Sequence, residues 1–231
     1  MQLKIIKMKK TLMIGAIALF GAVSAQEYKP TAGDVTVDLG LSGGLGNTSV
    51  NLANQSFGIG PMFKARYFKT DNLAYRMTMI VGNNSDTDNP NDNTVVKNND
   101  FGIGLGFGLE KHYTGTERLS PYIGGDVLVG YASENTKTTV TPPAGTTGTV
   151  VVTETTGPNA FRLGVRGVFG ADYYFAKRVF LGVEAGLAVM YSSEGETTFS
   201  QTGSPDVTVK GSNNFRIEPA VVTGIRLGFA F

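Results

Sequence analysis

The sequence predicts an all-β protein: an up-and-down, antiparallel transmembrane β-barrel of eight strands, preceded by a cleavable signal peptide. Three observations predict this fold. Residues 215–231 alternate between apolar side chains and small or charged ones, which is the period of a strand with different surroundings on its two faces. Eight such segments occur, joined alternately by long and short connections. The first 25 residues have the pattern of a secretory signal.

The N-terminal segment combines a basic start with an uncharged run. It begins with four lysines (Lys4, Lys7, Lys9 and Lys10), and residues 11–25 carry no charge. The run ends in Val23-Ser24-Ala25, where small side chains suit signal peptidase, so we expect cleavage after Ala25. The expected domains are a signal peptide, 1–25, and one barrel domain, 26–231.

Composition narrows the class further. Without the four signal-peptide lysines, 16 of the 20 basic residues remain beside 19 acidic ones, a net charge of −3, which argues against a nucleic-acid partner. The chain has no cysteine, so neither disulfides nor thiolate chemistry are available. It has 31 glycines, 14 phenylalanines and 9 tyrosines but no apolar run long enough for a membrane helix, which favours strands that cross a membrane.

The predicted strands share apolar side chains at every second position, with glycine, polar or charged residues between them. In chain order they occupy residues 34–42, 57–68, 73–82, 101–113, 119–132, 161–175, 179–191 and 215–231. The alternation is clearest in 101–113, where apolar residues interleave with four glycines. A tilted strand crosses a bilayer with about 9–11 residues. Most of these segments are long enough.

The connections between the strands alternate in length. Short turns lie at 69–72, 114–118 and 176–178, and long connections at 43–55, 83–100, 133–158 and 192–214. Long loops on one side and short turns on the other are typical of outer-membrane barrels. The Thr/Val-rich connection 133–158 either extends as a hairpin beyond the membrane, with edges for a partner, or forms a polar loop.

Aromatic residues recur at the strand ends and predict two girdles. A phenylalanine opens each strand that follows a long connection, and tyrosines close two strands that lead into one. The predicted outer girdle comprises Phe57, Phe101, Phe161, Phe215, Tyr131 and Tyr191. Tyr67, Tyr75, Tyr113, Tyr173 and Phe231 fit the opposite girdle.

Alternation alone leaves open which face points inward. A soluble ligand carrier would bury the apolar face. Here the polar face is rich in glycine, which suits a solvent-exposed strand poorly, and its charges nearly balance. We therefore expect an interior charge network. Its expected members are Asp38, Lys64, Arg66, Arg76, Glu110, Asp126, Arg162, Arg166, Asp172, Glu184, Arg216, Glu218 and Arg226.

Two interiors are compatible with such a network. An eight-stranded barrel is just wide enough to be filled by its own side chains, and unpaired charge in so dry a space is costly. This favours a salt-bridged plug in which Glu184, Glu218 and Asp126 pair with Arg166, Arg216 or Arg226. The alternative is a narrow polar conduit lined by the same groups.

Two segments resemble the small outer-membrane β-barrel family, the OmpA/OmpX-type eight-stranded barrels, and most closely the stand-alone forms of the Bacteroidetes. They are RLGFAF at 226–231 and YTGTERLSPY at 113–122. The resemblance implies an integral barrel in the bacterial outer membrane of a Gram-negative cell, surrounded by its lipid. It also implies that the barrel-assembly machinery recognises Phe229 and Phe231. The sequence ends with its last strand, so we expect no peptidoglycan-binding domain.

The sequence predicts no enzyme, cofactor or metal site. The one histidine, His112, falls beside a short turn at the inner end of the barrel. The acidic stretch 84–92 has Pro90 where a calcium loop needs a ligand and lacks the required glycine. We expect a structural or surface-interaction role, with long extracellular loops that bind a partner. The alternative is a narrow porin-like channel for small solutes or hydrophobic molecules.

Overall fold

The computed structural model describes residues 28–41 and 61–231, and at residues 41, 61 and 218–225 it describes the backbone alone. The predicted signal peptide and Phe57 therefore lie outside the described residues. Strands make up all the regular structure described. Among these residues, no helix has the length and apolar character that a membrane span requires.

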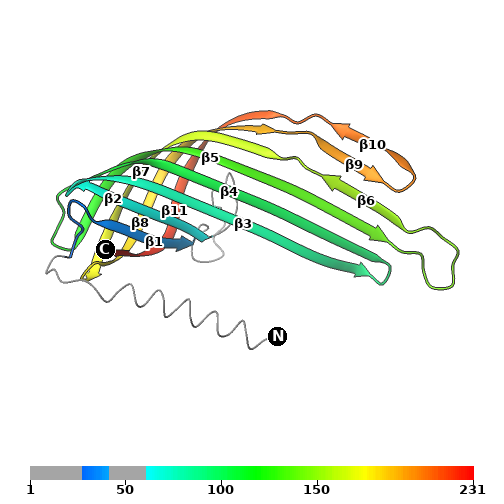
Figure 1. Ribbon diagram of the computed structural model, residues 1–231, viewed down its shortest axis with the longest axis horizontal. Helices are drawn as coiled ribbons and strands as arrows, with labels where there is room; N and C mark the ends of the chain where they lie inside the picture. Colours follow the sequence, from blue (N-terminus) through cyan, green and yellow to red (C-terminus); the bar gives the residue numbers. More distant parts are fainter. Residues whose placement is uncertain (1–27, 42–60) are drawn as a thin grey trace.

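Eight strands close into a ring, which confirms the predicted antiparallel barrel (Figure 1). Each ring strand pairs with antiparallel neighbours, and the pairings of β1 with β11 and of β5 with β7 complete the closure. The ring consists of β1 (Val35–Leu41), β2 (Pro61–Thr70), β3 (Leu73–Asn91), β4 (Thr94–His112), β5 (Leu119–Val140), β7 (Ala160–Ala176), β8 (Val179–Glu194) and β11 (Asn213–Ala230).

Two of the predicted loops, 83–100 and 192–214, are largely strands, which corrects the sequence analysis, and connection 133–158 forms the extended hairpin that was one of its two expected alternatives. The connection 83–100 continues the β3–β4 ladder as far as Asn91↔Thr94, and β5 reaches Val140 and pairs with β6 (Val151–Thr156). The connection 192–214 contains β9 (Thr197–Gln201) and β10 (Ser204–Val209). Backbone hydrogen bonds hold these ladders and do not require alternating apolar side chains. The Asn/Asp/Thr-rich sequence therefore lacked the pattern from which strands are predicted. We call this six-stranded extension, in the order β10-β9-β6-β5-β4-β3, the projecting sheet (Figure 1).

The outward face of the ring is apolar. Val127 is 57% exposed and Phe169 is 63% exposed, and the outward positions of neighbouring strands are similar. At one end Tyr131 lies opposite Phe161. Tyr191 lies opposite Phe215, and Phe101 is exposed on the same face. The described members of the outer girdle therefore lie together.

The second aromatic girdle lies at the other end, where Tyr67 stacks on Tyr75 with ring centroids 6.5 Å apart. Tyr173 also lies at this end, opposite Leu119. The twelve residue steps from Phe161 to Tyr173 span about 40 Å of strand, or about 30 Å at a tilt of about 40°. A bilayer's hydrocarbon core is about 30 Å thick. The apolar face therefore matches a membrane, with the charged face inside.

The segment before β1 crosses the end of the barrel that carries the short turns. Tyr28 accepts a hydrogen bond from Arg118, 2.8 Å away, and the guanidinium lies 4.3 Å from the centre of its ring. Asp34 pairs with Arg178 at 3.0 Å, and Asp71 accepts a hydrogen bond from the Ala32 amide. Residues 28–34 are thus bound to all three short turns.

Candidate functional site: the charged barrel interior

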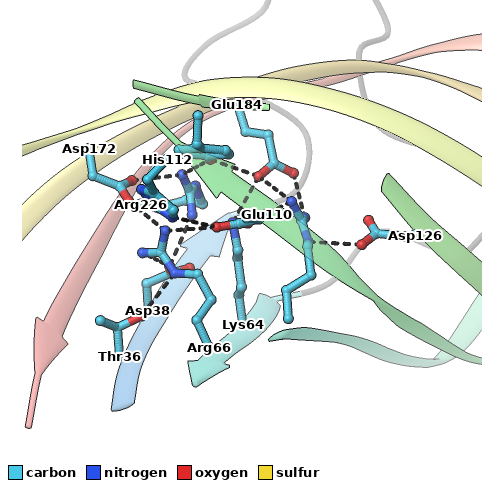
Figure 2. A network of polar contacts seen from close by, with 12 residues as sticks. Thr36, Asp38, Lys64, Arg66, Glu110, His112, Asp126, Asp172, Glu184 and Arg226 are labelled. Carbon is cyan, nitrogen blue, oxygen red and sulfur yellow. Dashed lines mark hydrogen bonds and ion pairs between the residues drawn. The ribbon is translucent and has the colours of Figure 1, made fainter. Parts of the chain in front are cut away.

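Ten charged side chains meet inside the ring, five basic and five acidic (Figure 2). They come from β1, β2, β3, β4, β5, β7, β8 and β11, and each occupies an inward position of its strand. Each is at most 5% exposed. The members of this charge network are Asp38, Lys64, Arg66, Arg76, Glu110, Asp126, Arg166, Asp172, Glu184 and Arg226.

Arg226 and Arg66 hold the part of the network nearest the barrel seam. Arg226 contacts Asp38 at 2.9 Å and Asp172 at 3.1 Å. Arg66 contacts the same two carboxylates, at 3.4 Å and 2.5 Å. Asp38 lies on β1 and Arg226 on β11, the two strands that close the ring, so these ion pairs cross the closure.

Glu110 and Glu184 hold the centre of the network. Glu110 contacts Lys64 at 2.5 Å, Arg76 at 2.7 Å and Arg66 at 3.2 Å. Glu184 contacts Lys64 at 2.9 Å and Arg76 at 2.8 Å. Glu184 therefore bridges opposite walls, since Lys64 and Arg76 lie on β2 and β3 while Glu184 lies on β8; Glu110, on β4, joins neighbouring strands of one wall. Paired charges link the walls across the lumen.

Asp126 connects the centre to the outer part of the network. Its carboxylate contacts Arg166 at 2.5 Å and the Nε of Arg76 at 2.9 Å. Of the pairs expected from the sequence, Asp126–Arg166 is present. The expected partners of Glu184 were wrong, because its side chain reaches Lys64 and Arg76 instead of an arginine at 166, 216 or 226. The alternation along a strand determines whether a side chain faces inward, but the stagger between strands determines which side chain it meets.

Two predicted members lie outside the buried network. Arg216 is exposed and Arg162 is half-buried. Both hold inward positions, since Arg216 lies opposite Met190 and Arg162 opposite Gly130, but they lie near the open outer end of the ring. They therefore face inward as expected, but they are not buried with the other ten. The side chain of Glu218 lies outside the described residues.

Tyr122 and Thr36 belong to the network although the sequence analysis did not include them. The Tyr122 hydroxyl donates to Glu184 at 2.8 Å and accepts from Arg226 at 2.7 Å, and the Lys64 ammonium lies 4.8 Å from its ring centre. The Thr36 hydroxyl accepts from Arg66 Nε at 2.9 Å. Both residues occupy inward positions of their strands, and this alternation is the sequence signal that could have included them in the network.

The network lies between two uncharged layers. On the inner side, Phe68, Tyr174 and Phe180 are buried, with the Tyr174 and Phe180 rings 5.2 Å apart. On the outer side, five buried apolar residues form one cluster: Met62, Ile80, Leu128, Ala188 and Met190. Beyond this cluster a recess of about 540 Å³ opens outward, lined by residues that include Asp100, Glu134 and Arg162.

His112 lies in a Ser–His–Glu arrangement at the inner end of the network. Its Nδ1 is 2.9 Å from the Ser120 hydroxyl and its Nε2 is 3.3 Å from Glu110. The ring packs between Phe68 and Tyr122, with centroid distances of 5.0 and 5.2 Å. Ser120 is buried, and Glu110 is shared with three cations, so the group has the geometry of a packed polar cluster.

The described residues include no group of three or more histidine, cysteine, aspartate or glutamate side chains arranged to hold a metal ion. What the ten charges can do is neutralise one another. Their equal numbers and their burial produce a cross-section in which each charge meets a partner of opposite sign. An eight-stranded barrel is just wide enough for its own side chains to fill.

Comparison with known proteins found a matching family model and a similar solved structure. The model of the family described as "Putative OmpA-OmpF-like porin family" matches residues 70–231. Among solved structures, the solid-state NMR structure of outer membrane protein AlkL in DMPC lipid bilayers is 18% identical, with a TM-score of 0.35; the match covers 91% of this chain and 94% of that one. Comparison with curated proteins gave no match.

Proposed function

Because the chain belongs to the OmpA-OmpF-like porin family and is a bacterial outer-membrane β-barrel, we propose that it acts as a closed barrel with a structural and surface-interaction role. The observation that carries this proposal is the charge network. Its members span the lumen between the aromatic layer and the apolar cluster, and they are at most 5% exposed. These charges are buried and paired with one another, and an eight-stranded barrel is just wide enough to be filled by its own side chains.

The projecting sheet supports the interaction half of the proposal. Six strands continue past the outer girdle, and β10 forms the free edge of the sheet in the described part of the chain. All six residues of β10 are exposed. An exposed edge offers backbone hydrogen-bonding groups to an incoming strand. We therefore assign the interaction role to the projecting sheet, which the barrel anchors outside the membrane.

The same geometry supports two further parts of the proposal. We propose no catalytic role, because Ser120 and His112 are buried and Glu110 is ion-paired with three cations. We also propose that Phe229 and Phe231 serve as the signal for the barrel-assembly machinery. Phe231 is exposed on the outward face, and its amide donates to the Val35 carbonyl at the seam of the ring.

Solute permeation distinguishes the closed barrel from the porin-like alternative. We expect liposomes that contain the refolded protein to swell in arabinose or glycine no faster than protein-free liposomes. Heat-modifiable migration on gels verifies that the reconstituted protein is folded. Swelling that rises with the amount of folded protein would contradict the closed interior and favour the channel.

A further inference from the structure

The base of the projecting sheet separates its charges by sign. In the outer halves of β3, β4 and β5, the acidic residues are Asp86, Asp88, Asp100 and Glu134, and the basic residues are Lys97 and Lys137. All four acids occupy even positions, which continue the inward face of the ring. Both lysines occupy odd positions, which continue the outward face that carries Phe101 and Tyr131.

The register makes this separation certain along β4 and β5. Their ladder runs without a bulge from His112↔Tyr122 to Thr94↔Val140, so the parity set inside the membrane holds outside it. Lys97 therefore stands on the same face as Phe101, four residues farther out. Figure 1 shows both strands continuing well beyond β1 and β2.

Lys97 and Lys137 are direct cross-strand neighbours. Residues so paired have Cβ atoms about 5 Å apart, and like charges in this position are destabilising. Lys137 has a partial counter-charge in Glu154 of β6, 3.6 Å away, while Lys97 has no ion pair within the described part of the chain. Both lysines are exposed, so the pair carries an excess positive charge that an external anion would neutralise.

The side chains between the girdle and the lysines form an ordered series. Above Phe101 comes the directly opposed amide pair Asn99↔Asn135, and above the amides comes the lysine pair. Amides bind hydroxyl groups, and ammonium groups bind phosphates. From the membrane outward, the face thus presents apolar, aromatic, amide and cationic groups.

The height of the lysine pair suits a lipid headgroup. Four residues of strand are about 13 Å long, or about 10 Å above the girdle at a tilt of about 40°. Lysine side chains reach back toward an interface along their flexible stems. The ammonium groups can therefore lie at the level of phosphates attached to a sugar headgroup.

From this series we infer that Lys97, Lys137, Asn99 and Asn135 form a binding surface for a phosphorylated glycolipid of the outer leaflet. The acyl chains lie against the outward apolar face, the amides bind sugar hydroxyls, and the two ammonium groups hold a phosphate. The surface is continuous with the lipid-facing belt. It rests on the outer-membrane location and not on the closed interior, so it stands or falls separately from the proposed function.

Native mass spectrometry of the refolded barrel with lipid A, and with the same lipid after removal of its phosphates, tests this inference. We expect tighter binding of the phosphorylated form. The double variant Lys97→Gln/Lys137→Gln should bind it about 30-fold more weakly, as two basic residues near an anionic surface predict. Glu154→Gln should bind it more tightly, because the competing carboxylate beside Lys137 is gone.

The matched control is Lys69→Gln/Lys111→Gln, which removes two exposed lysines at the opposite end of the barrel. Its binding should equal that of the parent chain, and heat-modifiable migration should show that every variant is folded. Equal losses in the two double variants would mean unspecific attraction and would overturn the inference. Equal binding of the two lipid forms by the parent chain would overturn it as well.

Discussion

Arg226 shows how a single residue can hold a membrane barrel closed. Its guanidinium is fully buried. It contacts Asp38 of β1, Asp172 of β7 and the Tyr122 hydroxyl. A buried charge is costly unless it is paired and its hydrogen-bonding groups are satisfied. The Arg226–Asp38 pair also joins β11 to β1, the last and first strands of the ring. Its attraction therefore stabilises the closure of the barrel.

Replacement of Arg226 by methionine should therefore destabilise the fold strongly. The side chain keeps its apolar stem but leaves Asp38 and Asp172 with Arg66 as their remaining cation, and breaking a buried pair costs about 3–5 kcal/mol. Urea unfolding of the refolded protein in lipid, followed by gel migration, measures the change.

Arg216→Met is the control for this substitution, because Arg216 lies on the same strand but is exposed. Its free energy of unfolding should fall by about 1 kcal/mol at most, because the interactions of an exposed charged side chain contribute about 0–1 kcal/mol. Equal stability of the Arg226 and Arg216 variants would show that the interior ion pairs do not hold the barrel.

For single residues, the sequence predicts whether a side chain faces the lumen or the membrane. It does not predict which charged residue that side chain pairs with. Even positions on β5, such as Asp126, and the corresponding positions on other strands could be assigned inward from alternation alone. That Glu184 meets Lys64, far away in the sequence, depends on the stagger of strands on opposite walls. Distance from the open end also matters, and it is why Arg162 and Arg216 are less buried than Arg166.

At the scale of the elements, each long strand passes through two environments. β4 has buried glycines and apolar outward residues up to Phe101, and exposed polar residues beyond it. The alternation of hydrophobicity predicts the membrane part of the strand well. The alternation is lost in the outer part of the strand, where both faces are in water. Only the backbone hydrogen bonds continue there, so the sequence indicated loops.

The girdle offers a test of this division. Tyr131 and Phe199 are almost equally exposed, at 43% and 42%, but Tyr131 lies at the membrane interface and Phe199 lies in the projecting sheet. Tyr131→Ala should lower the free energy of unfolding in bilayers by about 1 kcal/mol or more, because aromatic side chains favour the interface and Tyr131 pairs with Phe161.

Phe199→Ala should have a smaller effect in the same urea titration, since β9 pairs with β6 and β10 in the projecting sheet and not with a ring strand in the described part of the chain. A larger loss for Phe199→Ala than for Tyr131→Ala would mean that the membrane boundary lies farther out along the strands. It would also move the lysine pair into the bilayer.

At the scale of the whole molecule, the protein is a barrel with its polar side chains inside and a sheet that rises from one side of its rim (Figure 1). Three layers fill the lumen: aromatic residues, the charge network and the apolar cluster around Leu128. In the closed barrel that we propose, these layers separate the outer recess from the inner end.

Single-channel recording of the refolded protein in a planar bilayer tests this closure most directly, because ions detect a narrower path than sugars do. The account predicts no steady conductance from the parent chain. Reproducible conductance steps from the parent, altered in size by Arg226→Ala, would contradict it and show that the charges line an open pore.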